Sequence, residues 1–313
     1  MKTTSENSQA FARRQSWRTL TLAVVMMAGM AGAVSLARWI DSSRPSLDPR
    51  TEAEQLYLAG KTVRRLSLGF NGLVADWYWM RSLQYLGRKV LAAREDVQID
   101  NLGQVNLGLL APLLDTATTV DPQFLAPYEY AAVVLPAVDP DQAIKIVKKG
   151  IEANPSRWGL YQHLGYIYWK QGDFQAAGET YGKGAAIPGA PVWMEAMKAQ
   201  MAAKGGSRST AQQIYARMYQ GTDDPGVRDM ALRRLMQLQW FEERDAIRRV
   251  LGEYAALEKR CASSWKDVAA ALRKAGLRVD ASGTPFDPAG FPYRLVNEGC
   301  DVELDSRTQV IRE

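Results

Sequence analysis

Histidine and cysteine are both scarce in this chain, which has one His and two Cys among 313 residues. A Ser-His-Asp triad would have to use His163, since there is no other histidine. A zinc site needs several His or Cys ligands close together, and the sequence contains no such cluster. We therefore expect no catalytic residues, no metal and no other cofactor.

The chain also lacks a strong excess of charge of one sign. Its 39 Lys and Arg stand against 34 Asp and Glu, and the net charge is +5. Basic residues are interspersed with acidic ones, whereas nucleic-acid-binding proteins concentrate them on one face. We expect no nucleic-acid partner. The hydrophobic fraction of 47% is typical of a folded chain with a sizeable core.

One long apolar run lies close to the start of the sequence. Residues 19–37 carry no charge and lie between Arg18 and Arg38. At a rise of about 1.5 Å per residue, such a helix nearly spans the ~30 Å hydrocarbon core of a bilayer. A buried core helix is the alternative. The small residues at 31–33 and 35–37 also fit a signal-peptidase site, although this run is long for a signal peptide.

We predict a membrane anchor that is kept in the mature protein, and we leave a cleaved signal peptide open. The predicted segments are a basic cytoplasmic tail at 1–18, a transmembrane helix at 19–40 and a polar linker at 41–50. Four Lys or Arg precede the span and three follow it within a similar length, which favours a cytoplasmic N-terminus. The chain is then a single-pass protein of a bacterial inner membrane, with its C-terminal body in the periplasm.

The two cysteines are consistent with an oxidising compartment. Cys261 and Cys300 would close a loop near the C-terminus, as disulfides do in exported proteins. The alternative is a pair of unpaired buried thiols, because spacing alone does not decide pairing. We predict Cys261–Cys300 as a candidate disulfide.

An aromatic block follows the linker at residues 66–87. Leu73, Trp77 and Met80 recur at helical spacing, which predicts the core face of a helix. A ligand-binding aromatic patch is the alternative interpretation. Asp76 lies among these residues, and we expect it to pair with Arg64 or Arg81 without a catalytic role.

Small residues recur 34 positions apart in the middle of the chain. Ala131, Ala143 and Gly150 are followed 34 residues later by Gly165, Ala177 and Gly184. Such periodicity predicts stacked helix-turn-helix units, because one unit cannot bury its apolar face alone.

The signature of the clearest unit, residues 158–191, consists of Tyr161, Leu164, Gly165, Tyr168, Gly172, Ala177 and Tyr181. This pattern resembles the tetratricopeptide repeat. The resemblance implies a mainly α-helical superhelix over residues 51–260. It also implies a scaffold without enzymatic activity that binds a peptide or helix in a concave groove.

The resemblance further implies which residues line that groove. Transferring the variable positions of the family's first helix gives Gln162, Tyr166, Trp169 and Lys170 in the clearest unit, Tyr128 in the unit before it and Trp193 in the unit after it. Tyr and Trp suit partner capture, because they offer large contact areas at low entropic cost. The alternative is that Trp169 and Trp193 seal contacts between neighbouring helices.

Residues 261–313 depart from the repeat pattern. A short helix after Ser264, ended by Gly276, and two strands at 293–296 and 302–304 predict a small α+β cap. The string Asp-Pro-Ala-Gly-Phe-Pro-Tyr at 287–293 resembles a turn of pseudopilin-type proteins in secretion and pilus systems. A tight turn that ends the repeat array is the alternative.

Two functions follow from these patterns. The first is a membrane-anchored scaffold that binds a protein or peptide partner in the cell envelope, for secretion, pilus or envelope assembly. The second is an envelope enzyme that cleaves glycans with paired carboxylates. Its candidate acids are Glu129, Glu179 and Glu195, which fall in separate repeats.

Overall fold

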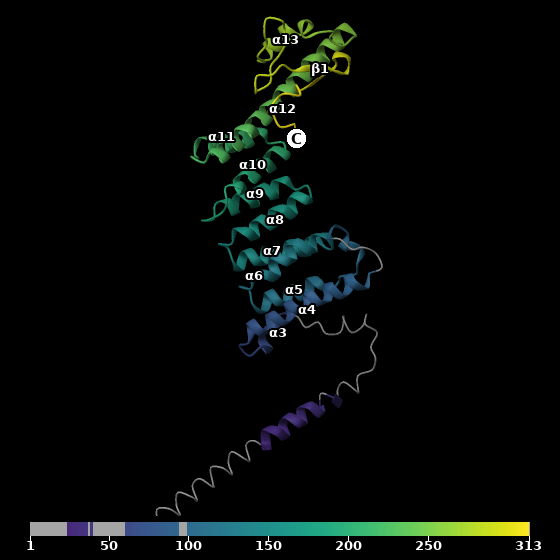
Figure 1. Cartoon of the computed structure of the whole chain (residues 1–313), viewed down its shortest axis with the longest axis vertical. Helices are drawn as coiled ribbons and strands as arrows, with labels where there is room; N and C mark the ends of the chain where they lie inside the picture. Colours follow the sequence, from purple (N-terminus) through teal and green to yellow (C-terminus); the bar gives the residue numbers. More distant parts are fainter. Residues whose placement is uncertain (1–23, 37, 40–59, 94–98, 313) are drawn as a thin grey trace, which may run out of the picture. The chain divides into compact units, whose positions relative to one another are not determined.

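The computed structural model describes residues 24–36, 38–39, 60–93 and 99–312, and it is mainly helical (Figure 1). The chain divides into two compact units, Met1–Tyr57 and Leu58–Glu313. In the first unit, residues 24–36 are helical with exposed side chains. The tail at 1–18, the linker at 41–50 and the remaining residues of the predicted anchor, apart from 38–39, lie outside the described part. No helix of the described residues combines the length and the apolar character needed to cross a membrane.

The second unit begins with helices α3 (Gly60–Leu66), α4 (Asn71–Ala92) and α5 (Leu110–Val120) and the short 3-10 helix η1 (Ile99–Gln104). Both α3 and α4 pack against α5. The face of α4 that is buried carries Ala75, Tyr78, Ser82 and Tyr85.

The predicted core face of α4 is therefore wrong. Leu73, Trp77 and Met80 are all exposed, on the side of the helix away from the buried face. Burial follows the neighbouring helix rather than the hydrophobicity of the stripe, because α5 meets the smaller and hydroxyl-bearing residues. Asp76 is exposed as well.

Three helix pairs follow along the chain (Figure 1). The first is α6 (Leu125–Val134), extended by the 3-10 helix η2 (Leu135–Ala137), with α7 (Pro140–Ala153); the second is α8 (Trp158–Lys170) with α9 (Phe174–Ala185); the third is α10 (Trp193–Lys204) with α11 (Arg208–Gln220). Asp139 and Asp173 begin α7 and α9 by accepting a backbone N–H in the first turn, which is a strong helix-start signal.

The second helices of the pairs repeat every 34 residues. They begin at Pro140, Phe174 and Arg208, and Ala143, Ala177 and Ala211 have no exposed surface. Small residues are needed where helices approach closely. The predicted helix-turn-helix repetition is thus present in the structure.

The expected repeat unit at residues 230–257 is not present. This region belongs to one continuous helix, α12 (Pro225–Glu258). Asp224 accepts the N–H groups of Gly226 and Val227 at its start. Between residues 227 and 251 the sequence has neither Gly nor Pro, so nothing in it favours a turn.

Residues 261–313 form the small cap on α12. It contains the 3-10 helix η3 (Trp265–Asp267), α13 (Ala269–Lys274), β1 (Arg294–Val296), the 3-10 turn η4 (Asn297–Gly299) and β2 (Asp301–Glu303). The two strands are antiparallel, with Leu295 opposite Val302. The helix-then-hairpin order that the sequence predicts is present.

The cap shares its hydrophobic core with the second half of α12. Trp240 and Ile247 of α12 pack in one cluster with Trp265 and Tyr293 of the cap. Arg248 of α12 also donates two hydrogen bonds to Asp301, at 2.7 and 2.9 Å. Residue 260 is therefore not a boundary between independent cores.

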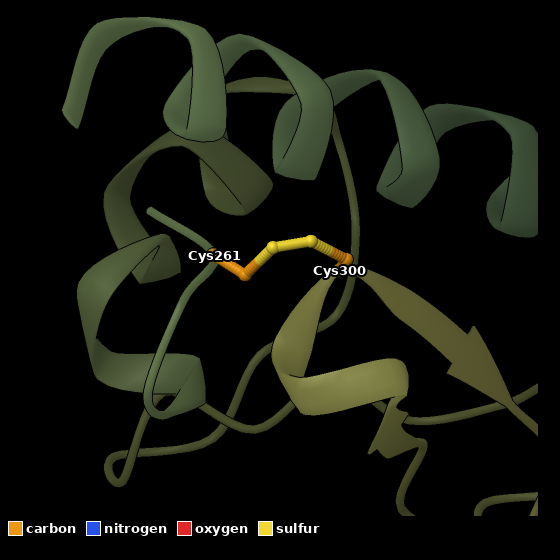
Figure 2. Close-up of a disulfide and its surroundings, with 2 residues drawn as sticks. All are labelled: Cys261 and Cys300. Atoms are coloured by element: carbon orange, nitrogen blue, oxygen red, sulfur yellow. A yellow bond between two sulfur atoms is a disulfide. The ribbon is translucent and has the colours of Figure 1, made fainter. Parts of the chain in front are cut away.

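Cys261 and Cys300 form a disulfide, with their Cα atoms 5.0 Å apart (Figure 2). The bond joins the start of the cap to the turn between its two strands. The described residues contain no free cysteine.

Candidate partner-binding surface

The first helix of the second pair, α8, presents an aromatic surface. Tyr166 is 47% exposed, and its ring meets the ring of Trp169 edge to face at 5.8 Å. Lys170 is exposed and Gln162 is half-buried. Trp169 also packs against the cluster formed by Ala177, Tyr181, Met194 and Met201, so this indole ring contributes to a contact between helices as well.

The third pair adds a second exposed aromatic side chain. Trp193 at the start of α10 is 42% exposed, and its ring meets that of Trp158 at 6.2 Å. The predicted residues Tyr166 and Trp193 are thus accessible, one on each of two successive first helices.

Tyr128 does not belong to this surface. It is fully buried, its hydroxyl donates to the Thr118 carbonyl oxygen at 3.3 Å, and its ring lies against Gly150. In the next pair the equivalent packing is made by Tyr161 against Gly184.

The error at Tyr128 comes from the repeat register. Helix α6 begins 33 residues before α8, whereas α7 begins 34 residues before α9. Transfer by 34 therefore aligns Tyr128 with Gln162, while the packing aligns it with Tyr161. One residue on a helix is a rotation of about 100°, which converts a surface position into a core position.

A pocket of about 460 Å³ lies beside α10, between it and α11, α12 and the C-terminal segment. Its lining residues share a strong positive charge: five of them are the cations Lys204, Arg208, Arg234, Arg244 and Arg312. Gln200, Ala203, Tyr215, Gln237, Leu238 and Phe241 complete the lining, which has no carboxylate.

One carboxylate adjacent to the pocket offsets part of this charge. Asp245 accepts a hydrogen bond from Arg208 at 2.5 Å and lies 3.5 Å from Arg244. Burial raises the pKa of Asp245, but the hydrogen bond from Arg208 and the charges of Arg208 and Arg244 outweigh it, so the pKa is below its ordinary value. Asp245 is therefore ionised at neutral pH, and the pocket keeps an excess of positive charge.

Phe241 organises the guanidinium groups of the pocket. Arg208 and Arg244 lie 5.6 and 5.1 Å from the centre of its ring, within the range of cation–π attraction. The Nε–H of Arg244 is buried and has no acceptor among the residues that the structure describes. A buried unpaired donor is costly, and an acceptor oxygen of a ligand would satisfy it.

The aromatic and basic features meet on one face of α10. Trp193, Gln200 and Lys204 are spaced i, i+7 and i+11, which places them on one side of an α-helix. The rise between Trp193 and Lys204 is about 16 Å. This face therefore offers an aromatic contact at one end and positive charge at the other.

Sequence reasoning missed most of the pocket. Four of its five cations come from α11, α12 and the C-terminal segment, outside the positions that the repeat pattern marks. The dense basic residues of α12, such as Arg234 and Arg244, were a signal. They were uninformative alone, because acids alternate with them along the helix.

The carboxylates suggested for glycan cleavage are dispersed. Glu129, Glu179 and Glu195 lie on α6, α9 and α10, and Glu179 accepts a hydrogen bond from its neighbour Gln175. His163 is on α8, where burial lowers its pKa and the charge of Glu129 partly opposes the shift. Within the described ranges, no group of three or more His, Cys, Asp or Glu is placed to bind a metal ion.

Searches against protein-family models and against curated proteins found no match to this chain.

Proposed function

We propose that this protein is a membrane-anchored scaffold of the tetratricopeptide type that binds an acidic peptide segment of a partner protein in the cell envelope. The observation that carries the proposal is the pocket beside α10, with five cations and no carboxylate in its lining. An ionised carboxylate is the protein group that such a pocket attracts most strongly.

The aromatic residues support a peptide rather than a free anion. Tyr166 and Trp193 are exposed on successive first helices, and exposed Tyr and Trp are frequent anchors for protein partners. An extended peptide of about five residues covers the ~16 Å between Trp193 and Lys204. The partner segment would place an apolar side chain at Trp193 and acidic side chains in the pocket.

The same pocket offers nothing for the glycan-cleaving alternative. Glycoside hydrolysis needs two carboxyl groups across one cleft, and this lining has none. We therefore favour binding over catalysis, and we propose a role in secretion, pilus or envelope assembly.

The envelope location rests on two features. The uncharged run at 19–37 is the proposed anchor, and the disulfide between Cys261 and Cys300 suits an oxidising compartment. Fusion of alkaline phosphatase after Glu313 tests this location. An active fusion is expected for a periplasmic body, whereas an inactive one would place the body in the cytoplasm.

Peptide binding tests the proposed function. Fluorescein-labelled peptides with a Trp followed by Asp and Glu residues would be titrated with the full chain in detergent, and fluorescence anisotropy would report binding. We expect saturable binding, and we expect no binding of peptides with Lys at the acidic positions. Equal binding of both peptide sets would contradict the proposal.

Two matched lysines provide the control. Lys204 and Lys183 are both exposed and both lie in the last turn of a helix, but only Lys204 is among the pocket residues. Lys204→Glu should weaken acidic-peptide binding at least tenfold, while Lys183→Glu should leave it within a factor of two. Trp193→Ala should weaken it severalfold.

A further inference from the structure

The turn between α3 and α4 exposes a concentrated apolar surface. Leu68 is 86%, Phe70 68% and Leu73 71% exposed. Together with three further exposed side chains they form what we call the apolar tip: Leu66, Leu68, Phe70, Leu73, Trp77 and Met80. Single exposed apolar residues are normal, but a contiguous group marks an interaction surface.

The backbone holds this tip in a fixed form. Leu68 and Gly69 have φ values of 50° and 94°, and the left-handed region is uncommon for leucine. The Ser67 hydroxyl donates to the Arg64 carbonyl oxygen, and the Phe70 N–H donates to the Ser67 carbonyl oxygen, both at 2.8 Å. A hydrophobic residue in a strained, exposed turn suggests a use for its side chain.

The fold itself does not use the apolar tip on α4. Leu73, Trp77 and Met80 follow the spacing i, i+4 and i+7, while α5 covers the opposite face with Tyr78 and Ser82. A mostly apolar pocket of about 400 Å³ opens between α3 and α4, and Leu66, Leu73 and Trp77 of the tip are among its lining residues.

Positive charge surrounds the apolar tip. Residues 60–93 contain six Lys or Arg and one acid, Asp76. Arg64 and Arg65 are exposed in the last turn of α3. The guanidinium group of Arg81 lies 5.2 Å from the centre of the Trp77 ring, which combines an aromatic ring and a cation at one place.

We propose that the apolar tip docks into the headgroup region of an anionic phospholipid bilayer. Apolar and aromatic side chains would enter the boundary with the acyl chains, and the surrounding cations would meet lipid phosphates, as in other interfacial helices. The inference rests on the proposed membrane attachment, because the apolar run at 19–37 and the start of α3 at Gly60 are only 22 residues apart in the sequence.

Spin labels on the full chain test this contact. Leu73→Cys and, as a control, Ser209→Cys on α11 would each be labelled, since both native cysteines are in the disulfide. Collision with oxygen reports lipid exposure, and collision with a water-soluble nickel chelate reports water exposure. The chain would be reconstituted into vesicles of phosphatidylcholine with phosphatidylglycerol, and into vesicles of phosphatidylcholine alone.

We expect the label at position 73 to show a severalfold higher ratio of oxygen to nickel collisions in the anionic vesicles than the label at position 209. The double change Arg64→Glu and Arg65→Glu should return position 73 to the control value. A water-exposed label at position 73 in a chain that floats with the vesicles would overturn the docking and leave the anchor intact.

Two other results would also overturn the proposal. A label shielded from both reagents would mean that protein covers the tip, either the chain's own N-terminal segment or a second copy. A chain that does not float with anionic vesicles would refute both the anchor and the lipid contact. Binding of acidic peptides at the α10 pocket is measured in detergent and does not depend on any of these results.

Discussion

The ring of Tyr181 on α9 lies directly against Gly165 on α8. A Cβ atom at residue 165 would be 2.9 Å from Cε2 of that ring, closer than atoms in ordinary contact. The pair brings the two helices of the second repeat together, because the missing side chain leaves room for the aromatic ring.

Gly165→Ala should therefore destabilise the protein despite the higher helix propensity of alanine. The added methyl group overpacks the interface, and we expect a loss of about 1–3 kcal/mol in the free energy of unfolding. Gly159 on the same helix has no neighbouring atom within 4 Å of the corresponding position. Gly159→Ala should leave the melting temperature unchanged or slightly raised. Equal effects of the two changes in thermal unfolding would contradict this packing argument.

The disulfide should contribute strongly to the stability of the cap. Cys261 and Cys300 are 39 residues apart, and closure of such a loop restricts the unfolded chain by about 4 kcal/mol in the entropic model. We expect the double change Cys261→Ser and Cys300→Ser to lower the midpoint of denaturation, as monitored by the fluorescence of the buried Trp265. The helix pairs should retain their circular dichroism signal, and their simultaneous loss would refute this expectation.

Stability should fall in alkaline solution because of the buried tyrosines. Burial raises the pKa of Tyr128 and of Tyr181 to about 12, from an ordinary value of 10.0. The unfolded chain loses these protons first, so the contribution is complete below pH 10 and is lost as pH rises from 10 through 12. Burial and the hydrogen bond to Glu243 also raise the pKa of Tyr293.

Tyr181→Phe isolates this effect. Because phenylalanine does not ionise, the free energy of unfolding of the variant should fall less steeply between pH 10 and 12 than that of the wild type. Urea unfolding at a series of pH values measures the two slopes. Identical slopes would show that Tyr181 ionises equally in both states.

Binding of acidic peptides should weaken as salt is added. Screening shortens the Debye length from about 8 Å at 0.15 M to about 3 Å at 1 M, which reduces attraction to the cations around Phe241. We expect a severalfold loss of affinity over that range by anisotropy, and a smaller loss for Lys204→Glu. A salt-independent affinity would assign the binding to the aromatic residues alone.

Local periodicity predicted much of the helical organisation correctly. The 34-residue spacing of Ala143, Ala177 and Ala211 survives as fully buried positions, because close approach of helices demands small residues wherever it occurs. The pattern was less reliable in the first helices, where a change of one residue rotated Tyr128 from the surface into the core. The break after residue 230 was also wrong, since α12 continues without a turn.

The sequence by itself determined the helix pairs, the order of helix and hairpin in the cap, and the scarcity of His and Cys. These depend on nearby residues, such as the Asp caps and the turn glycines. Tertiary structure decided which face of α4 meets α5, and it brought Lys204, Arg234 and Arg312 to one pocket. Neither could follow from local patterns, because both depend on which segments, distant in the chain, pack side by side.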